Sequence, residues 1–224
     1  MLTSFRPDYT FLDGGAMPAR QFGDFEIAEE RAVHSASLSC AINNTGPLTR
    51  YMLDCLPRLN DLETRARASG MHVVIDSRVS MLMPGMYPAI PGWHCDGVPR
   101  PDKHAQPDFR LLNPAAINYI ASISTDANGV SNTEFVADHI ACDISPDEPV
   151  WRQVHRAVED IKPRTDFMPD GVWTSFGPYA IHRATPAKVR GWRIWVRVSL
   201  YHKPPHNIRA RHSQVYLLSE ENGW

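Results

Sequence analysis

The chain has 224 residues, of which 43% are hydrophobic and 21% are charged. These values are typical of a soluble globular protein with one substantial core. The net charge of −2 gives no electrostatic reason to expect nucleic acid as a partner, and no basic stripe with interleaved aromatic residues suggests one.

The cysteines and the beginning of the chain indicate a cytoplasmic protein. Cys40, Cys55, Cys95 and Cys142 show no CxxC spacing, which favours reduced thiols and no structural zinc. The first residues lack the basic and then apolar order of a signal peptide. No apolar stretch is long enough to cross a bilayer, so we expect no membrane partner.

Residues 1–70 predict a flanking region that contains one helix. Apolar side chains recur at helical spacing from Leu48 to Ser69, and Gly70 supplies a C-terminal stop. Pro57 should kink or divide this helix, because proline interrupts the hydrogen bonding of a helix interior.

The remainder predicts mainly strands, and the nineteen prolines between apolar runs suit short strands joined by turns. Five segments are rich in β-prone residues: His72–Met83, Ala115–Ser124, Thr133–Ala137, Gly171–Phe176 and Trp192–Tyr201. A second helix should begin at Ser145, because residues 145–148 fit a capping box, and should end at Pro163. We therefore expect a single α+β, mainly β, domain over residues 1–224, built on a β-sandwich.

Residues 91–97 read Pro-Gly-Trp-His-Cys-Asp-Gly and contain a His-x-Asp. In a strand, residues i and i+2 point to the same side, so His94 and Asp96 can bind one metal while Cys95 faces away. These are two of the three ligands of a two-histidine, one-carboxylate triad. The spacing arises readily by chance in a chain with ten histidines, so a third ligand has to support it.

His182 is the best candidate for that third ligand, because it follows a Gly177-Pro178 turn and precedes a long strand. His155 and His202 are rivals, since each also precedes an arginine by nine residues. His155 falls on a predicted helix, where a hydrogen-bonded core role is expected. His202 enters the Pro204-Pro205 segment, which should end the strand.

The strand Trp192–Tyr201 has two contrasting faces. Arg193, Trp195, Arg197 and Ser199 share one face, and bulky apolar residues share the other. Two arginines here are costly to bury unless they bind an anion.

The order His-x-Asp, then about ninety residues, then His, then Arg about ten residues later resembles the Fe(II)/2-oxoglutarate-dependent dioxygenase superfamily, over roughly residues 72–201. The resemblance implies a double-stranded β-helix, which is a jelly-roll or cupin-like fold, with a few flanking helices. It implies His94, Asp96 and His182 as the ligands of Fe(II), and Arg193 as the anchor for the far carboxylate of 2-oxoglutarate. Residues 83–85, Met-Pro-Gly, are most similar to the phytanoyl-CoA-dioxygenase-like branch.

Three further residues are candidates for binding the co-substrate. Arg197 either binds a carboxylate of the substrate or keto acid, or forms an ion pair on a solvated face. Asn118 and Tyr87 lie on or near predicted strands that reach the keto acid, although core and turn roles are the alternative for both.

The family's activity implies use of O2 and release of succinate and CO2, here with hydroxylation of a small organic substrate. Halogenating relatives carry a small residue where this chain has Asp96, which favours hydroxylation. Basic residues between Gly97 and Pro114, including Lys103, hint at an anionic substrate, although Asp102 and Asp108 nearly cancel them.

Two alternatives stay open. A cupin-type metalloenzyme would use the same triad without 2-oxoglutarate, and it would have no need of Arg193. A non-catalytic binding domain on the same fold is less favoured, because buried metal ligands are costly to retain without a metal.

Overall fold

The structure is a computed structural model that describes residues 2–17, 22–102, 104–112, 116–126 and 130–210. Strands dominate it, and every strand pairing among the described residues is antiparallel. The larger sheet has the order β2 (Tyr9–Ala16), β9 (Val172–Phe176), β5 (Ile117–Ser124), β11 (Gly191–Tyr201) and β4 (His72–Leu82). The smaller sheet has the order β10 (His182–Ala184), β6 (Thr133–Val136) and β8 (Thr165–Phe167). Two further pairs join β1 (Leu2–Phe5) to β7 (Ile140–Asp143) and β12 (Ile208–Ala210) to β3 (Ala32–His34).

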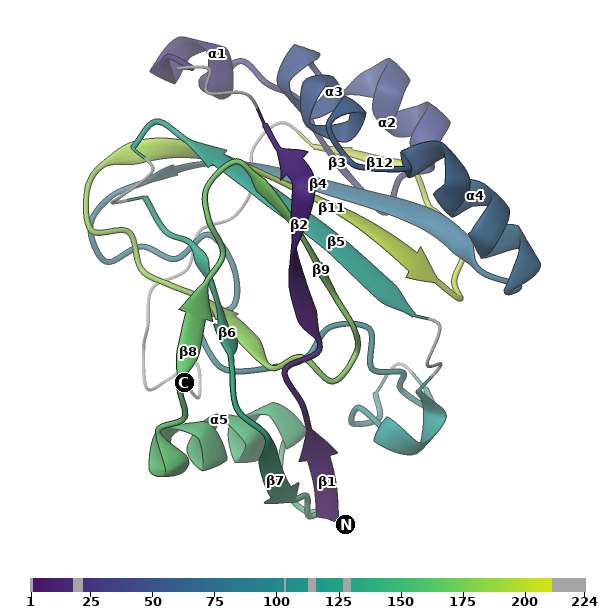
Figure 1. The fold of residues 1–224 in the computed structure, drawn as a ribbon, viewed down its shortest axis with the longest axis vertical. Helices are drawn as coiled ribbons and strands as arrows, with labels where there is room; N and C mark the ends of the chain where they lie inside the picture. The colour runs from purple at the N-terminus through teal and green to yellow at the C-terminus, as the bar shows by residue number, and fades with distance from the viewer. Residues whose placement is uncertain (1, 18–21, 103, 113–115, 127–129, 211–224) are drawn as a thin grey trace.

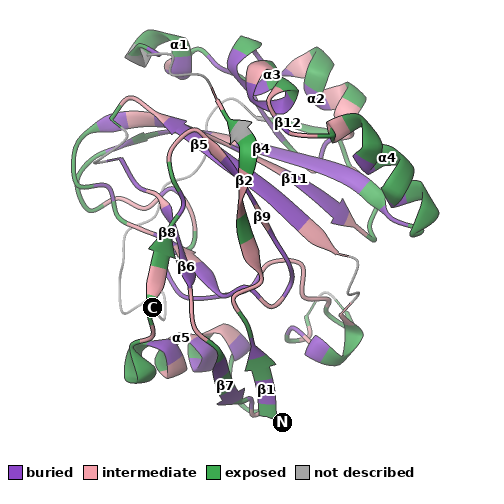
Figure 2. Ribbon diagram, in the orientation of Figure 1, coloured by how far each residue is buried: buried purple, intermediate pink, exposed green. Residues whose placement is uncertain are grey.

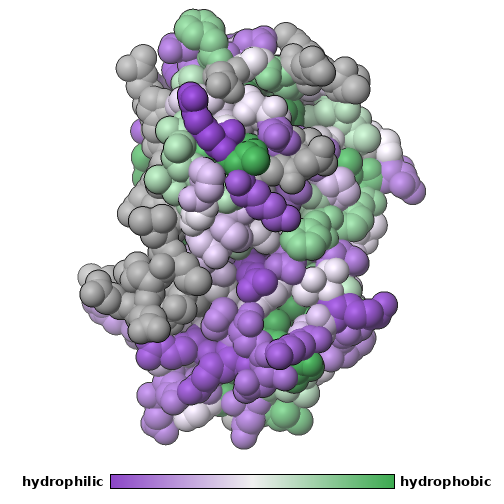
Figure 3. Space-filling view, turned by 90° about the vertical axis from the view of Figure 1, so that its left-hand side faces the viewer, coloured by the Kyte–Doolittle hydropathy of each residue, from purple (hydrophilic) through white to green (hydrophobic). Residues whose placement is uncertain are grey.

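The helices lie outside the sheets (Figure 1). Four of them cover the outer face of the larger sheet: α1 (Asp24–Ala28), α2 (Leu38–Asn44), α3 (Pro47–Asp54) and α4 (Leu59–Ala68). The fifth, α5 (Val150–Ile161), lies at the other end of the molecule beside β7 and β1 (Figure 1). Hydrophilic side chains gather on that lower half of the face drawn in Figure 3. No helix in the described segments has the length and hydrophobicity needed to cross a membrane.

Strand β11 separates the main core from the interior between the sheets. Ile194, Val196 and Val198 are fully buried in the cluster that the sheet forms with α1 to α4. Arg193 and Arg197 point to the other side, where they line a cavity. The two predicted faces of this strand are therefore confirmed. Figure 2 shows that β4, β5 and β11 are buried along most of their length.

The first predicted helix is divided as expected. Helix α3 ends at Asp54 and α4 begins at Leu59, with Pro57 between them. Gly70 adopts φ +64, a left-handed conformation that suits glycine and ends the second piece.

The second predicted helix begins later than expected. Helix α5 starts at Val150 with Pro149 at its N-cap, so the capping box predicted at Ser145 is wrong. The side chain of Gln153 accepts a hydrogen bond from the Ser145 amide at 2.8 Å and donates to the carbonyl oxygens of Ser145 and Glu148, each at 2.9 Å. These contacts hold residues 145–148 as a turn.

The five segments predicted as strands are strands, apart from one or two residues at their ends; Ala115 lies outside the described residues. Sequence patterns missed the others, most of which have three or four residues. The first seventy residues also contribute to the sheets, because β2 forms the edge of the larger sheet beside β9.

Candidate metal centre

His94 and His182 are held side by side by the backbone. The amide of His94 donates to the carbonyl of His182 at 3.0 Å, and the amide of His182 donates to the carbonyl of His94 at 2.9 Å. The two residues form an isolated antiparallel bridge, and His94 lies outside the strands of the fold. The assumption that the His-x-Asp segment forms a strand is therefore wrong. The bridge places the two imidazole rings 4.7 Å apart between centroids.

Each imidazole is oriented by a carbonyl oxygen two residues earlier in the chain. Nδ1 of His94 lies 2.8 Å from the oxygen of Gly92, and Nδ1 of His182 lies 3.0 Å from the oxygen of Ala180. A proton on Nδ1 makes both hydrogen bonds and leaves the lone pair on Nε2 available to a metal.

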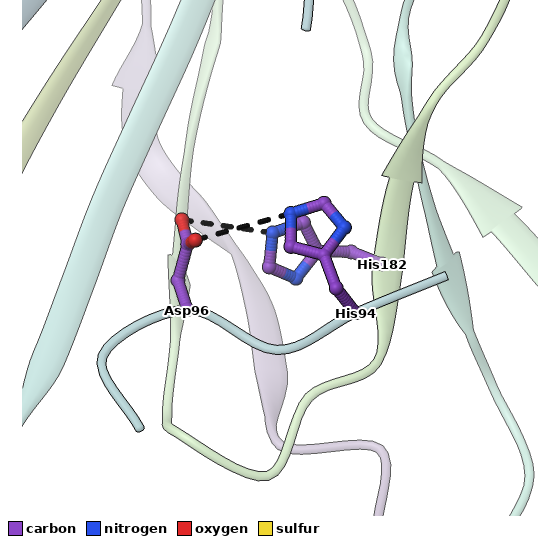
Figure 4. Close-up of side chains that lie close together, drawn as sticks. All are labelled: His94, Asp96 and His182. Atoms are coloured by element: carbon purple, nitrogen blue, oxygen red, sulfur yellow. Dashed lines mark ion pairs between the residues drawn. The ribbon is translucent and has the colours of Figure 1, made fainter. Parts of the chain in front are cut away.

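Asp96 completes a group of three (Figure 4). Its Oδ1 is 3.9 Å from Nε2 of His94, and its Oδ2 is 3.7 Å from Nε2 of His182. One candidate ligand atom from each residue lies within 4.8 Å of the others. Two imidazole nitrogens and one carboxylate fit Fe(II), because such a triad leaves coordination positions open for small molecules.

The protonation states suit metal binding. Burial and the neighbouring His182 lower the pKa of His94 to about 4, so its imidazole is neutral at physiological pH. Burial alone would raise the pKa of Asp96, but Arg197 and the two histidines hold it well below its ordinary value. A neutral imidazole and an ionised carboxylate are the forms that bind metals.

Trp93 ties the His-x-Asp segment to helix α5. Its backbone amide donates to Nδ1 of His155 at 3.3 Å, and its indole NH donates to Glu159 at 2.9 Å. The guanidinium of Arg183 lies 4.1 Å from the centre of the indole ring and also donates to Glu159. The helix therefore fixes the residue that precedes His94. Sequence analysis missed this role of Trp93, although His155 and Glu159 have the i, i+4 spacing of one helix face.

A cavity of about 100 Å³ lies between the two sheets and contains the triad. A volume of this kind has room for several water molecules. Ile120, Phe176 and Trp195 give it apolar surface from the larger sheet, and Pro88 to Ile90 form a further wall. Four arginines also line it: Arg78, Arg183, Arg193 and Arg197.

Arg193 is buried in this cavity with only 5% of its surface exposed. Its Nε has no hydrogen-bond partner, and it forms no ion pair with any residue that the structure describes. Burial lowers the pKa of Arg193 to about 10, while Asp170 acts in the opposite direction. Burying a guanidinium without a bound anion or a close ion pair is costly, and an anion would compensate that cost.

Arg197 lies in the same cavity but already pairs with two carboxylates. Its Nη1 donates to Asp96 at 2.6 Å and its Nη2 donates to Asp76 at 2.7 Å. Of the two roles considered for Arg197, the structure shows an ion pair, although a partly buried one. Asp76 was missed by sequence analysis; the alternation of Asp76, Arg78 and Ser80 in their strand is the signal that marks this face.

The other two candidate co-substrate residues lie outside the cavity. Asn118 is buried on β5, where its Oδ1 accepts a hydrogen bond from Ser199 at 2.7 Å. It lines a neighbouring cavity of about 280 Å³ that shares Asp96 and Arg197 with the first. Tyr87 is half-buried and directly precedes the wall that begins at Pro88, without lining the cavity itself.

The remaining candidates lie apart from the triad. His155 holds Trp93, and His202 is exposed at the end of β11, where its ring packs on Tyr201. Cys95 packs in the apolar cluster beneath α5 and does not line the cavity, as predicted, although residues 94–96 do not form a strand. No described residue of the loop 98–112 lines the cavity; Lys103, and the Arg211 that follows His202, lie outside the described residues.

No family model matches the chain, and no curated protein matches it. Among solved structures, the chain is similar to an N-substituted L-amino acid dioxygenase from Burkholderia ambifaria AMMD. The identity is 13%, the match covers 88% of this chain and 78% of that one, and the TM-score is 0.38. A structure of such a dioxygenase in complex with alpha-KG is similar at 10% identity, covering 83% and 74%, also with a TM-score of 0.38.

Proposed function

We propose that the chain is an Fe(II)- and 2-oxoglutarate-dependent oxygenase on a double-stranded β-helix fold, and that it hydroxylates a small organic substrate. One observation carries the proposal: a buried arginine, Arg193, whose Nε has no partner, lines the same cavity as His94, Asp96 and His182. A site for a metal and a site for a carboxylate thus occur in one small space.

His94 and His182 would hold the iron through Nε2, and Asp96 through a carboxylate oxygen. When bound, Fe(II) supplies the redox chemistry by which O2 oxidises the substrate while 2-oxoglutarate is converted to succinate and CO2. The protein binds and orients the reactants and excludes competing reactions. Phe135 and Phe176 pack against the ring of His182, which limits the access of water to that side.

Arg193 supports the choice of 2-oxoglutarate as co-substrate. The guanidinium is desolvated, and an anion that reaches it would compensate the cost of burying its charge. A keto acid that binds a metal at one end carries a second carboxylate at the other. An enzyme that used the triad alone, as in the cupin-type alternative, would gain nothing from this buried charge. A non-catalytic binding domain would not need two Nε2 atoms directed at one carboxylate.

The lining of the cavity supports a small substrate with an anionic group. Arg78 forms one hydrogen bond, to the carbonyl of Pro88 at 3.3 Å, and no ion pair with a described residue. Arg183 and Arg197, in contrast, each have two carboxylate partners. Like Arg193, Arg78 therefore presents to this mainly apolar cavity a positive charge that has no ion pair with a described residue.

The test is anaerobic addition of Fe(II) and then 2-oxoglutarate, followed by visible absorption spectroscopy of the bidentate chelate. We expect a weak charge-transfer band in the wild type and none in His182→Ala. Arg193→Met should need roughly 10- to 100-fold more keto acid for the same band, because it loses a charge-assisted hydrogen bond.

Arg164→Met is the matched control, since Arg164 pairs with Asp138 on the surface and should leave the titration unchanged. Metal binding without a band at any keto-acid concentration would exclude 2-oxoglutarate and favour the cupin-type alternative. A wild-type chain that binds no metal would exclude both enzymes and favour the binding domain.

A further inference from the structure

Arg197 bridges the candidate metal ligand Asp96 and a second buried carboxylate, Asp76. Its Nη1 donates to Oδ2 of Asp96 at 2.6 Å, while Nε and Nη2 donate to Oδ2 of Asp76 at 3.3 and 2.7 Å. Such charge-assisted hydrogen bonds are roughly twice as strong as neutral ones. The guanidinium donates in its plane to two different carboxylates, through Nη1 to one and through Nε and Nη2 to the other. Lysine cannot reproduce this geometry.

Pairing within the sheet and contacts from the end of β3 fix Asp76 in place. It lies directly opposite Arg197 in the antiparallel pair of β4 and β11, so both side chains point to the same face. Its Oδ1 accepts a hydrogen bond from the Ser35 amide at 2.8 Å and lies 2.6 Å from Nδ1 of His34. Both oxygens of Asp76 are therefore engaged, and only 5% of its surface is exposed. Arg197 has little freedom to turn away from Asp96.

The two oxygens of Asp96 are consequently not equivalent. Oδ2 accepts the short hydrogen bond from Arg197, whereas no described residue donates a hydrogen bond to Oδ1. Oδ1 lies 3.9 Å from Nε2 of His94 and Oδ2 lies 3.7 Å from Nε2 of His182, so the contact with Arg197, and not the distance to the histidines, distinguishes the two oxygens. A carboxylate can bind a metal through one oxygen or through both, and the arginine favours the first mode by engaging one of them.

We infer that Arg197, held by Asp76, is a positioning residue that restricts Asp96 to a single metal-binding oxygen, Oδ1. The inference rests on the proposed function, because it presupposes the metal. Its consequence is an additional open position on the metal. Three protein ligands that each bind through one atom leave about three of six octahedral positions. A carboxylate bound through both oxygens would leave about two.

The number of metal-bound waters is the measurement that tests this role. Mn(II) is the probe, and the enhancement of water-proton relaxation by the loaded full-length protein scales with the number of exchangeable waters on the metal. We expect Arg197→Lys and Asp76→Asn each to lower the enhancement per bound Mn(II) by about a third, the loss of about one water in three. Lysine keeps the positive charge, so a purely electrostatic role would leave Arg197→Lys like the wild type.

A double variant separates positioning from independent effects. If Asp76 acts through Arg197, adding Asp76→Asn to Arg197→Lys should cause no further loss, because two residues that act through one contact are not additive. Glu30→Gln is the control for a change at a buried carboxylate, since Glu30 binds amides at the start of α3 and its variant should keep the wild-type enhancement. Thermal unfolding of the metal-free proteins identifies any variant that fails to fold, in which case the other single variant tests the same set of contacts.

Unchanged enhancement in both single variants would overturn the inference and leave the metal centre intact. Equal losses that add in the double variant would also overturn it, because Asp76 would then act independently of Arg197. A wild-type chain that binds no Mn(II) or Fe(II) would overturn both the inference and the proposed function, so the two failures are distinguishable.

Discussion

The carboxylate of Glu30 occupies the space in which Gly46 would carry a side chain. Glu30 has 2% of its surface exposed and accepts hydrogen bonds from the amides of Leu48 and Thr49 at 3.1 and 3.2 Å. It therefore accepts the hydrogen bonds of free amide groups in the first turn of α3, although it lies in a distant part of the chain. A side chain at the N-cap usually accepts such hydrogen bonds. Glycine at position 46 allows this approach.

Gly46→Ala should destabilise the fold. The added methyl group would displace the Glu30 carboxylate and leave two helix amides buried without a partner, so we expect a loss of about 2 kcal/mol or more in the free energy of unfolding. Gly23→Ala is the matched control: Gly23 is the N-cap of α1, and no atom lies within 4 Å of the position that the added methyl group would take. Urea unfolding should show a smaller loss there, about 1 kcal/mol or less, because alanine is a poorer N-cap than glycine, and equal losses in both variants would contradict this explanation.

Binding of a divalent metal should raise the melting temperature, because the backbone bridge holds His94 and His182 together before the metal arrives. At a free metal concentration of about 100 times Kd the gain is about 2.7 kcal/mol. His182→Ala should abolish the shift. His202→Ala should keep it, since His202 is exposed and lies outside the cavity that contains the triad. Differential scanning fluorimetry with Co(II) checks this. Loss of the shift in the His202 variant would contradict the assignment of His182 as the third ligand and favour His202.

Arg193→Met should stabilise the ligand-free protein while it weakens binding of the keto acid. The substitution replaces a buried, incompletely paired charge by an apolar side chain of similar length, a change that we expect to add about 1 kcal/mol or more. Chemical denaturation without ligand measures the gain. A variant less stable than the wild type would show that Arg193 has a structural role in the fold.

Asp76 should contribute to stability in a pH-dependent manner. Burial alone would raise its pKa, but Arg197, His34 and the Ser35 amide hold it below the ordinary value. The contribution is therefore fully present above the pKa of the unfolded chain, near 3.9, and is lost as the pH falls toward the folded value. Between about pH 5 and pH 2 the free energy of unfolding should fall more steeply for the wild type than for Asp76→Asn. Parallel curves from urea unfolding at each pH would contradict the assigned pKa direction.

Local alternation made the two faces of β11 predictable, and the i, i+2 spacing made His94 and Asp96 a candidate pair. The bridge between His94 and His182 was not predictable, because pairing between distant segments leaves no local signal. Strands of three or four residues, such as β3 and β10, are too short for their alternation to be recognised.

The start of α5 shows a different reason for error. Residues 145–148 fit the pattern of a capping box, yet Gln153 engages the same backbone groups from inside the helix. The pairing of Arg197 with Asp76 also escaped prediction. Both residues lie in predicted strands, but which strands are neighbours in a sheet is decided by the whole fold.

Strand β11 turns its two arginines and its aliphatic residues to opposite sides, which are two incompatible environments. A slip of one residue would turn Arg193 and Arg197 into the helix-packed core and bring Ile194 and Val196 into the cavity. We therefore expect related sequences to have no insertions or deletions within this strand. Evolutionary changes in length should be confined to the turns that precede and follow it.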